Sequence, residues 1–459
     1  MGCGDKKFKF GSFFKRWLKN DSGNVSMFFG FAIIPVILAS GSAIDFERIA
    51  DAKTKLQASV DSATLYAASL NETLDTVLKT KSQPFITANY IHDSDITLTS
   101  YTSHNAGDNI VGTAEISVKT WFMGLFGISR MIVNSQSMVK KSGINLEVSL
   151  VLDNTTSMAG TPIANLKTAA KNFVTKVMPT TQGQFYTKIA AIPYQNGVNL
   201  GSTASSARGT IQTGTSTTPG YQNYSFTNGD GNSKTLAITN CLTERTGPQA
   251  YTDASFALYP AGRAYMGGNN PCGVQQLVPL STTAATLNTT IDNMAAGSST
   301  AGQVGIAWGW YTLSPNVGIW SGTSQPAGYD KLTTTDVMTK VKKIMILMTD
   351  AEYNSANANG VITGNPTVSG SGGSSDHINL AATNGDSYTQ SASMCAAIKA
   401  SGVEIYVITF QLVKSIQKRV DLVNNCATDA SHILDADTTS LDVAFNGIAN
   451  SILTMRVAQ

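Results

Sequence analysis

Charged residues, histidines and catalytic motifs are scarce in this chain, and each shortage excludes a class of protein. Only 14% of the 459 residues are charged and the formal net charge is +2, which gives no case for a nucleic-acid partner. The four histidines are scattered, and none has metal-ligand spacing with another. The phosphate-binding loop GxxxxGK[ST] and the motifs GxSxG and HExxH do not occur. We therefore predict that the protein is not an enzyme.

Cysteine is also rare, and the spacing of the five cysteines limits the redox chemistry that the protein could perform. No CxxC motif occurs, which argues against thiol redox chemistry and a zinc ribbon. Cys3 stands apart near the N-terminus, and four cysteines lie in the second half of the chain: Cys241, Cys272, Cys395 and Cys426. An even number is typical of disulfides in an oxidising compartment. Three pairings are possible, and proximity in the sequence favours Cys241–Cys272 and Cys395–Cys426.

One long uncharged run, residues 25–44 (VSMFFGFAIIPVILASGSAI), is the main hydrophobic feature. About 20 apolar residues span the roughly 30 Å hydrocarbon core of a bilayer as a helix. Basic residues precede the run and acidic residues follow it, so we expect residues 1–24 in the cytoplasm and the remainder outside. A cleaved signal peptide is the alternative, because GSA at 41–43 suits a signal peptidase. The long basic region and the unbroken helical pattern favour a retained anchor.

Residues 45–145 form the next predicted unit. Apolar residues repeat at three- and four-residue steps over 45–70, which indicates a helix continuous with the anchor. Such a helix either packs with neighbouring chains, as a pilin-like stalk, or covers its own domain. Alternating runs at 95–102, 114–122 and 129–139 predict a small antiparallel sheet. The unit is therefore expected to be a compact α+β structure.

Residues 146–459 alternate strand-like and helix-like segments. This order predicts an α/β fold with a doubly wound, mostly parallel sheet covered by helices on both faces. Two polar stretches, at about 199–280 and 353–390, are too long for ordinary connections. They are expected to be either folded insertions or mobile loops.

Acidic and hydroxyl side chains follow the predicted strands of this sheet. Asp153 comes directly after the first strand, Asp350 after a later one, and Thr300 stands before a predicted helix. Because ligands bind beyond the carboxyl ends of such strands, these groups can converge with Thr155 and Ser157. Oxygen ligands with few charges suit Mg²⁺, and Mn²⁺ or Ca²⁺ would also fit. Taken singly, each residue could equally cap a helix or begin a turn.

The segment DNTTS, residues 153–157, resembles the metal-ion-dependent adhesion site of von Willebrand factor A domains. That motif consists of Asp-x-Ser-x-Ser, a later Thr and a later Asp; Thr replaces the first Ser here, and Ala351 replaces the usual Gly after the later Asp. The resemblance implies side-chain oxygen ligands, with the later Asp often acting through water. It also implies that an acidic residue of a protein partner completes the metal shell. The matching residues are Asp153, Thr155, Ser157, Thr300 and Asp350.

Together with the anchor and the small sheet, the order of these segments is similar to TadG-type proteins of bacterial tight-adherence (Flp) pilus assembly. In that family a TadE-like, pilin-like segment carries a von Willebrand A domain. The resemblance implies a single-pass inner-membrane protein with most of its chain in the periplasm. It further implies an accessory or minor-pilin-like role in adhesion or assembly, beside other pilus components. The alternative is a metal-independent structural component, and the sequence leaves open whether the protein enters the pilus.

Overall fold

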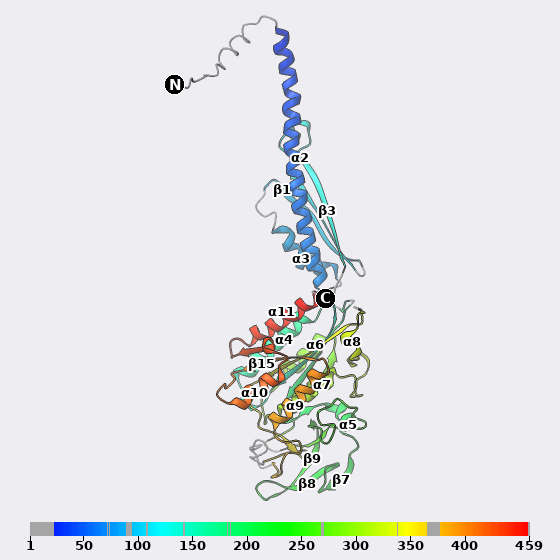
Figure 1. Ribbon diagram of the computed structural model, residues 1–459, viewed down its shortest axis with the longest axis vertical. Helices are drawn as coiled ribbons and strands as arrows, with labels where there is room; N and C mark the ends of the chain where they lie inside the picture. The colour runs from blue at the N-terminus through cyan, green and yellow to red at the C-terminus, as the bar shows by residue number, and fades with distance from the viewer. Residues whose placement is uncertain are drawn as a thin grey trace, which may run out of the picture. The chain divides into compact units, whose positions relative to one another are not determined.

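The computed structural model describes residues 23–457, except 71, 73, 89–93, 107–108, 141–142, 181, 184, 268–269, 337 and 365–376. Most of the predicted cytoplasmic tail, together with Cys3, lies outside the described residues. The chain divides into two compact units (Figure 1). The first comprises Met1–Ala68 and Leu74–Lys140, and the second comprises Ser69–Thr73 and Lys141–Gln459.

The first unit is built on one long helix, α2, Gly23–Ser69. By length and composition, its portion Met27–Ser69 is the one helix in the described part of the chain that could cross a membrane. Large apolar side chains at its N-terminal end, such as Phe28 and Phe31, are exposed, whereas Leu56 and Val60 further along are buried. The predicted apolar N-terminal helix is therefore confirmed, and it runs without a break into the region predicted as a stalk.

The C-terminal half of α2 packs on a three-stranded antiparallel sheet in the order β1-β2-β3. The strands are β1 Ile96–Ala106, β2 Asn109–Lys119 and β3 Arg130–Lys140. A second helix, α3 Asp75–Thr87, was not predicted; it buries Leu78, Ser82 and Ile86. Ser82 is polar, so α3 lacks the continuous apolar stripe that would have predicted a helix. The Ser82 hydroxyl oxygen lies 2.7 Å from the Tyr101 hydroxyl oxygen.

The second unit contains a six-stranded sheet in the order β11-β5-β4-β12-β15-β16. β5, β4, β12, β15 and β16 run parallel, and β11 pairs antiparallel with β5. The predicted mixed α/β architecture is confirmed. The strands are β4 Asn145–Asp153, β5 Thr187–Tyr194, β11 Val278–Ser281, β12 Val341–Thr349, β15 Glu404–Phe410 and β16 Ile433–Ala436.

Helices cover both faces of this sheet, and the strand residues alternate between two apolar cores. Val151 of β4 belongs to the core shared with α7, α9 and α10, whereas its neighbours Leu150 and Leu152 belong to the core shared with α4, α6 and α11. This alternation is why β4 is buried along its whole length. The helices are α4 Thr161–Val177, α6 Ala284–Asp292, α7 Gly302–Leu313, α9 Ser387–Ala400, α10 Gln417–Cys426 and α11 Leu441–Val457.

Helix α7 lies unusually close to the strands because glycines face them. A Cβ atom added at Gly305 would meet the Tyr194 ring at 2.6 Å, and one added at Gly309 would meet Val151 at 2.5 Å. All residues of α7 are buried. This close approach brings the N-terminal end of α7, and the loop before it, to the ends of the strands.

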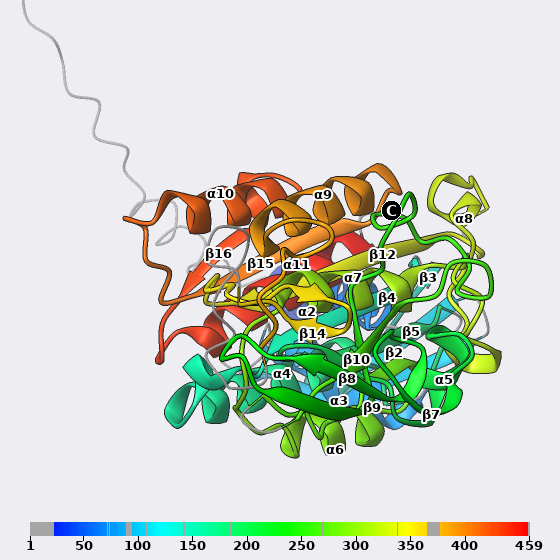
Figure 2. The same cartoon turned by 90° about the horizontal axis from the view of Figure 1, so that it is seen from below.

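The stretch at 199–280 is a folded insertion rather than a mobile loop. It contains a sheet in the order β10-β9-β8-β7, and β6 pairs with β9. Figure 2 shows β7 to β10 side by side in green. The last strand in this stretch, β11, joins the main sheet instead. The strands are β6 Val198–Asn199, β7 Gln212–Ser216, β8 Tyr221–Thr227, β9 Ser233–Thr243 and β10 Gly262–Tyr265.

Both favoured disulfides are confirmed. Cys241–Cys272 closes the folded insertion, and its Cα atoms lie 5.7 Å apart. Cys395–Cys426 joins α9 to α10, with Cα atoms 4.8 Å apart.

The second polar stretch, 353–390, contributes the short pair β13 Asn357–Ala358 and β14 Val361–Ile362, and residues 365–376 within it lie outside the described part of the chain.

Candidate metal centre at the strand ends

Asp153 is the last residue of β4, and its carboxylate is fully buried. Oδ1 accepts hydrogen bonds from the Thr155 backbone N–H at 3.0 Å and from the Thr155 hydroxyl at 2.6 Å. Oδ2 accepts from the Tyr194 hydroxyl at 2.8 Å and from the Thr349 hydroxyl at 3.3 Å. These donors come from the ends of both neighbouring strands, β5 and β12. The position and direction of the carboxylate are therefore fixed by the register of the sheet.

Two of the three hydroxyls of the DNTTS segment join this carboxylate in one hydrogen-bonded group. Thr155 Oγ1 lies 3.1 Å from Ser157 Oγ, so Asp153, Thr155 and Ser157 form one connected group. The residue that precedes the first turn of helix α4 is Gly160, and no side chain of the DNTTS segment forms a capping hydrogen bond to that helix. The helix-cap interpretation of these residues is therefore wrong.

Asp350 follows β12, the strand next to β4, and is almost wholly buried. Its Oδ1 accepts from the Glu352 N–H at 2.8 Å, which is the turn interaction expected of an Asp at this position. Burial, and then repulsion by the Asp350 charge, raise the pKa of Asp153 to about 7. Ala351, where the resembled family has Gly, adopts a positive φ of 57°. The backbone conformation that favours glycine is therefore retained.

Thr300 lies in the loop before α7, and hydrogen bonds join that loop to the other two. The Thr156 hydroxyl and N–H both donate to the Ser298 carbonyl, at 2.7 and 3.2 Å. The Thr300 N–H donates to Asn354 Oδ1 at 2.9 Å, four residues beyond Asp350. Ala301, the residue at the N-terminus of α7, makes no side-chain cap, so Thr300 does not begin the helix as a cap. Hydrogen bonds thus connect the segments that carry the five predicted site residues: Thr156 joins the DNTTS segment to the loop of Thr300, and Asn354 joins that loop to the segment after Asp350.

The donor set of these loops suits a hard cation. It offers two carboxylates and three hydroxyls, all of them oxygen donors, and the two carboxylates repel each other in a buried place. Within the described residues, no three His, Cys, Asp or Glu side chains are grouped to hold a metal. A cation at this edge would therefore be held by hydroxyl oxygens as much as by carboxylates.

The sequence did not predict the contribution of three side chains at this edge of the sheet. Tyr194 and Thr349 donate to Asp153, and Asn354 accepts from Thr300. Tyr194 and Thr349 are the final residues of β5 and β12. Placing the ends of the predicted parallel strands side by side would therefore have identified them. Asn354 stands in an irregular segment without any such pattern.

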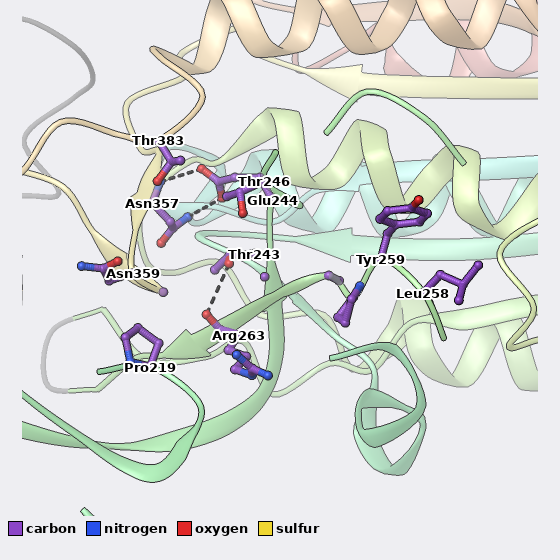
Figure 3. A pocket seen from close by; sticks show the side chains of 14 residues that line it. Pro219, Thr243, Glu244, Thr246, Leu258, Tyr259, Arg263, Asn357, Asn359 and Thr383 are labelled. Carbon is purple, nitrogen blue, oxygen red and sulfur yellow. Dashed lines mark hydrogen bonds between the residues drawn. The ribbon is translucent and has the colours of Figure 1, made fainter. Parts of the chain in front are cut away.

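A separate cavity of about 470 Å³ lies where the two polar stretches meet, and it shares no residue with the strand-end loops. In Figure 3 the Glu244 and Asn357 side chains point toward each other across one wall. Glu244 is buried and accepts from the Asn357 backbone N–H at 2.6 Å and side-chain amide at 2.9 Å, and from Gln303 of α7 at 3.4 Å. With these partners, the Glu244 carboxylate joins the insertion to the main domain.

Three of the solved structures with low similarity to this chain are of pilus proteins. The von Willebrand domain of the type V pili tip protein Mfa5 from Porphyromonas gingivalis is 13% identical, with a TM-score of 0.38 over 68% of this chain and 97% of that one. The tip pilin GBS104 from Group B Streptococcus agalactiae is 9% identical, with a TM-score of 0.36 over 66% and 99%. The pilus adhesin SpaC from Lactobacillus rhamnosus GG is 14% identical, with a TM-score of 0.35 over 79% of this chain. The match spans only 35% of SpaC. Likeness at this level does not establish a shared function.

No curated protein matches the chain. One family model does, over residues 23–70, and its description is "Putative Flp pilus-assembly TadE/G-like". The match falls on helix α2, from the apolar N-terminal end into the half that packs on the small sheet. The resemblance to Tad proteins predicted from the sequence is therefore confirmed, and this N-terminal segment of the chain is TadE/G-like.

Proposed function

We propose that the protein is a membrane-anchored accessory or minor-pilin-like component of Flp pilus assembly. The observation that carries this proposal is the TadE/G-like match on α2, a helix whose apolar N-terminal side chains have no cover within the described part of the chain. In this proposal α2 crosses the bacterial inner membrane once, with the basic tail in the cytoplasm and the bulk of the chain in the periplasm. The two disulfides fit that oxidising compartment.

We further propose that the second unit is a von Willebrand A-like module that binds a protein partner. The chain builds the sheet in two directions from β4: β5 and β11 lie on one side, and β12, β15 and β16 on the other. The switch point of such a doubly wound sheet lies between β4 and β12, and ligands bind outside the carboxyl ends of strands at that point. Asp153 is the last residue of β4 and Asp350 directly follows β12, which is the feature that supports the proposal most directly.

Mg²⁺, with Mn²⁺ or Ca²⁺ as alternatives, fits the oxygen donors of this site. The residues proposed to hold it are Asp153, Thr155, Ser157, Thr300 and Asp350. A bound cation would supply positive charge between the two carboxylates and attract an acidic side chain of a partner. Tyr194 and Thr349 would position the Asp153 carboxylate through their hydrogen bonds to Oδ2.

Titration calorimetry of the full chain in detergent with MgCl₂ and MnCl₂ tests the metal site. Thr155→Ala and Asp350→Ala should each weaken cation binding by about tenfold or more, since even groups behind the ligands contribute that much. Thr168→Ala is the control, because it removes an exposed hydroxyl on α4 that bonds to the Ala164 carbonyl of the same helix. Wild-type protein without any heat of binding at millimolar metal would favour the metal-independent structural role.

Partner binding needs its own test. Pull-down from bacterial membranes, with Mg²⁺ or with a chelator, should retain a partner only in the presence of the cation. The Asp350→Ala variant should lose that partner in both conditions. If Asp350→Ala retained the partner at wild-type levels with Mg²⁺ present, the adhesion-site proposal would be refuted while the pilus-assembly assignment would remain.

A further inference from the structure

The loop between β2 and β3, residues 120–129 (TWFMGLFGIS), carries large apolar side chains on its surface. A strand was predicted through residue 122, but β2 ends at Lys119, and the aromatic residues beyond it lie in the loop. Four of them are substantially exposed: Trp121, Leu125, Phe126 and Ile128. Leu125 is the most exposed of the four, at 74%. Adjacent apolar side chains with such exposure mark a contact surface.

The loop is fixed to α2 at one level of that helix. Asp45, which is buried, accepts backbone hydrogen bonds from Trp121, Phe122 and Met123, each at 2.8 Å. The Phe122 ring lies against the helix backbone, because a Cβ atom added at Gly41 would meet it at 2.4 Å. Figure 1 shows this end of the β2–β3 hairpin beside α2. The loop therefore stands where the predicted membrane span, residues 25–44, ends.

A second set of contacts fixes the Trp121 ring at the same level. The Arg48 guanidinium lies 3.7 Å from the ring centroid, and both side chains bond to Asp95 Oδ2 at 3.0 Å. Tryptophan beside a cationic side chain is characteristic of membrane–water interfaces, where one end of the ring is apolar and the other is hydrated. These contacts hold the loop in place without covering its exposed apolar side chains.

We propose that the β2–β3 loop inserts into the outer interfacial layer of the same membrane that α2 crosses. This inference rests on the proposed anchoring by α2. The exposed apolar side chains of the loop lie beside those of the helix, because Phe122 touches α2 at Gly41 and exposed apolar residues occur on both sides of that glycine, at Ile37 and Ile44. From Met27 to Gly41 the helix rises about 21 Å, at about 1.5 Å per residue, so the loop meets the bilayer near its surface.

A phospholipid surface is therefore the partner that we propose for the loop. This contact would also affect the orientation of the first unit, which contains α2 and the sheet β1–β3. A single helix leaves a protein free to tilt and to rotate about the axis of that helix relative to the bilayer. A second contact on one side of the helix restricts both, because tilt and rotation about the helix axis are set by such interfacial anchors. The sheet β1–β3 would then keep one orientation relative to the membrane plane.

Site-directed spin labelling of the full chain tests the insertion. In a Cys3→Ser background the four remaining cysteines are paired, so an introduced cysteine can be labelled selectively. Single labels are placed through Leu125→Cys in the loop, Phe31→Cys in the apolar run and Ser62→Cys on the exposed face of α2 beyond the span. The protein is reconstituted in vesicles of phosphatidylethanolamine and phosphatidylglycerol. Collision with oxygen and with a water-soluble nickel chelate then reports the depth of each label.

The ratio of oxygen to nickel accessibility should be several-fold higher at position 125 than at 62, and highest at 31. If position 125 matched 62 while 31 stayed in the bilayer, the loop insertion would be refuted and the anchor would stand. If 31 were also accessible to nickel, the proposed anchoring itself would fail, and the insertion with it. Protection of position 125 from both reagents would overturn the inference in favour of a second copy of the chain covering the loop.

Discussion

Replacement of the buried Asp153 carboxylate by an amide tests the electrostatics of the strand-end site. In metal-free protein, burial and the neighbouring Asp350 raise the pKa of Asp153 from 3.8 to about 7. The folded state therefore binds a proton that the unfolded state has released between pH 4 and 7. As a result, the free energy of unfolding falls as the pH rises through this window. Asp153→Asn removes the titrating group and with it this loss.

The magnitude follows from the size of the shift. A rise in the pKa of Asp153 from 3.8 to about 7 corresponds to at most about 4 kcal/mol, at about 1.4 kcal/mol for each step of one in pKa. The amide can keep the bonds from Thr155 through its oxygen, and the Tyr194 and Thr349 hydroxyls can rotate to accept from its nitrogen. Below pH 4 the variant should therefore be close to the wild type in stability. Above pH 7 it should be more stable than the wild type.

Urea unfolding in the presence of chelator, followed by tryptophan fluorescence at several pH values, measures this difference; Trp308 and Trp310 are buried in α7. Asp421→Asn, which removes an exposed carboxylate on α10, is the control for the loss of one charge. A constant difference between Asp153→Asn and wild type from pH 4 to 8 would refute the reasoning. Added Mg²⁺ should stabilise the wild type at pH 8 by mass action and leave the variant unchanged.

Three further changes test the packing of the second unit by urea unfolding. Lys343→Met leaves the Glu147 carboxylate buried without its cation and should cost about 3–5 kcal/mol, most of which Glu147→Gln in the same chain should restore. Removing the Cys395–Cys426 disulfide, which joins residues 31 apart, should cost about 3–4 kcal/mol, and a loss below about 1 kcal/mol would contradict the estimate. Ala351→Gly should change stability by less than about 1 kcal/mol, because relief of the positive φ offsets the lost methyl burial and the added flexibility.

The regular elements of both units were predictable where apolar residues recur with one period. The runs that became β4, β5, β12 and β15, and the stripes that became α4 and α11, encode their own conformation locally. The short edge strands β11 and β16 and the polar helices α3 and α10 carry no such pattern, and they went unpredicted. They form because the larger elements provide a surface or a hydrogen-bonding edge, which a local window of sequence does not contain.

The candidate site divides in the same way. Asp153, Thr155 and Ser157 alternate along five residues, and the prediction of a cation site needed their combination with Thr300 and Asp350 and the resemblance to a known motif. That Asp350 lies near enough to raise the pKa of Asp153 depends on β12 pairing with β4. The Tyr194 and Thr349 hydroxyls reach Asp153 Oδ2 only because three strand ends lie in register.

By itself, the sequence determined the apolar helix, the strand-and-helix order of the second unit and the oxygen-rich strand end. These features depend on composition and periodicity within a few residues. Tertiary structure decided that the 199–280 stretch folds, that Asp153 is fully buried, and that the strand predicted through Phe122 ends at Lys119, which leaves Trp121 in an exposed loop. The physical reason is that burial and pKa depend on which distant segments meet. For this loop, those segments are Gly41 and Asp45 of α2.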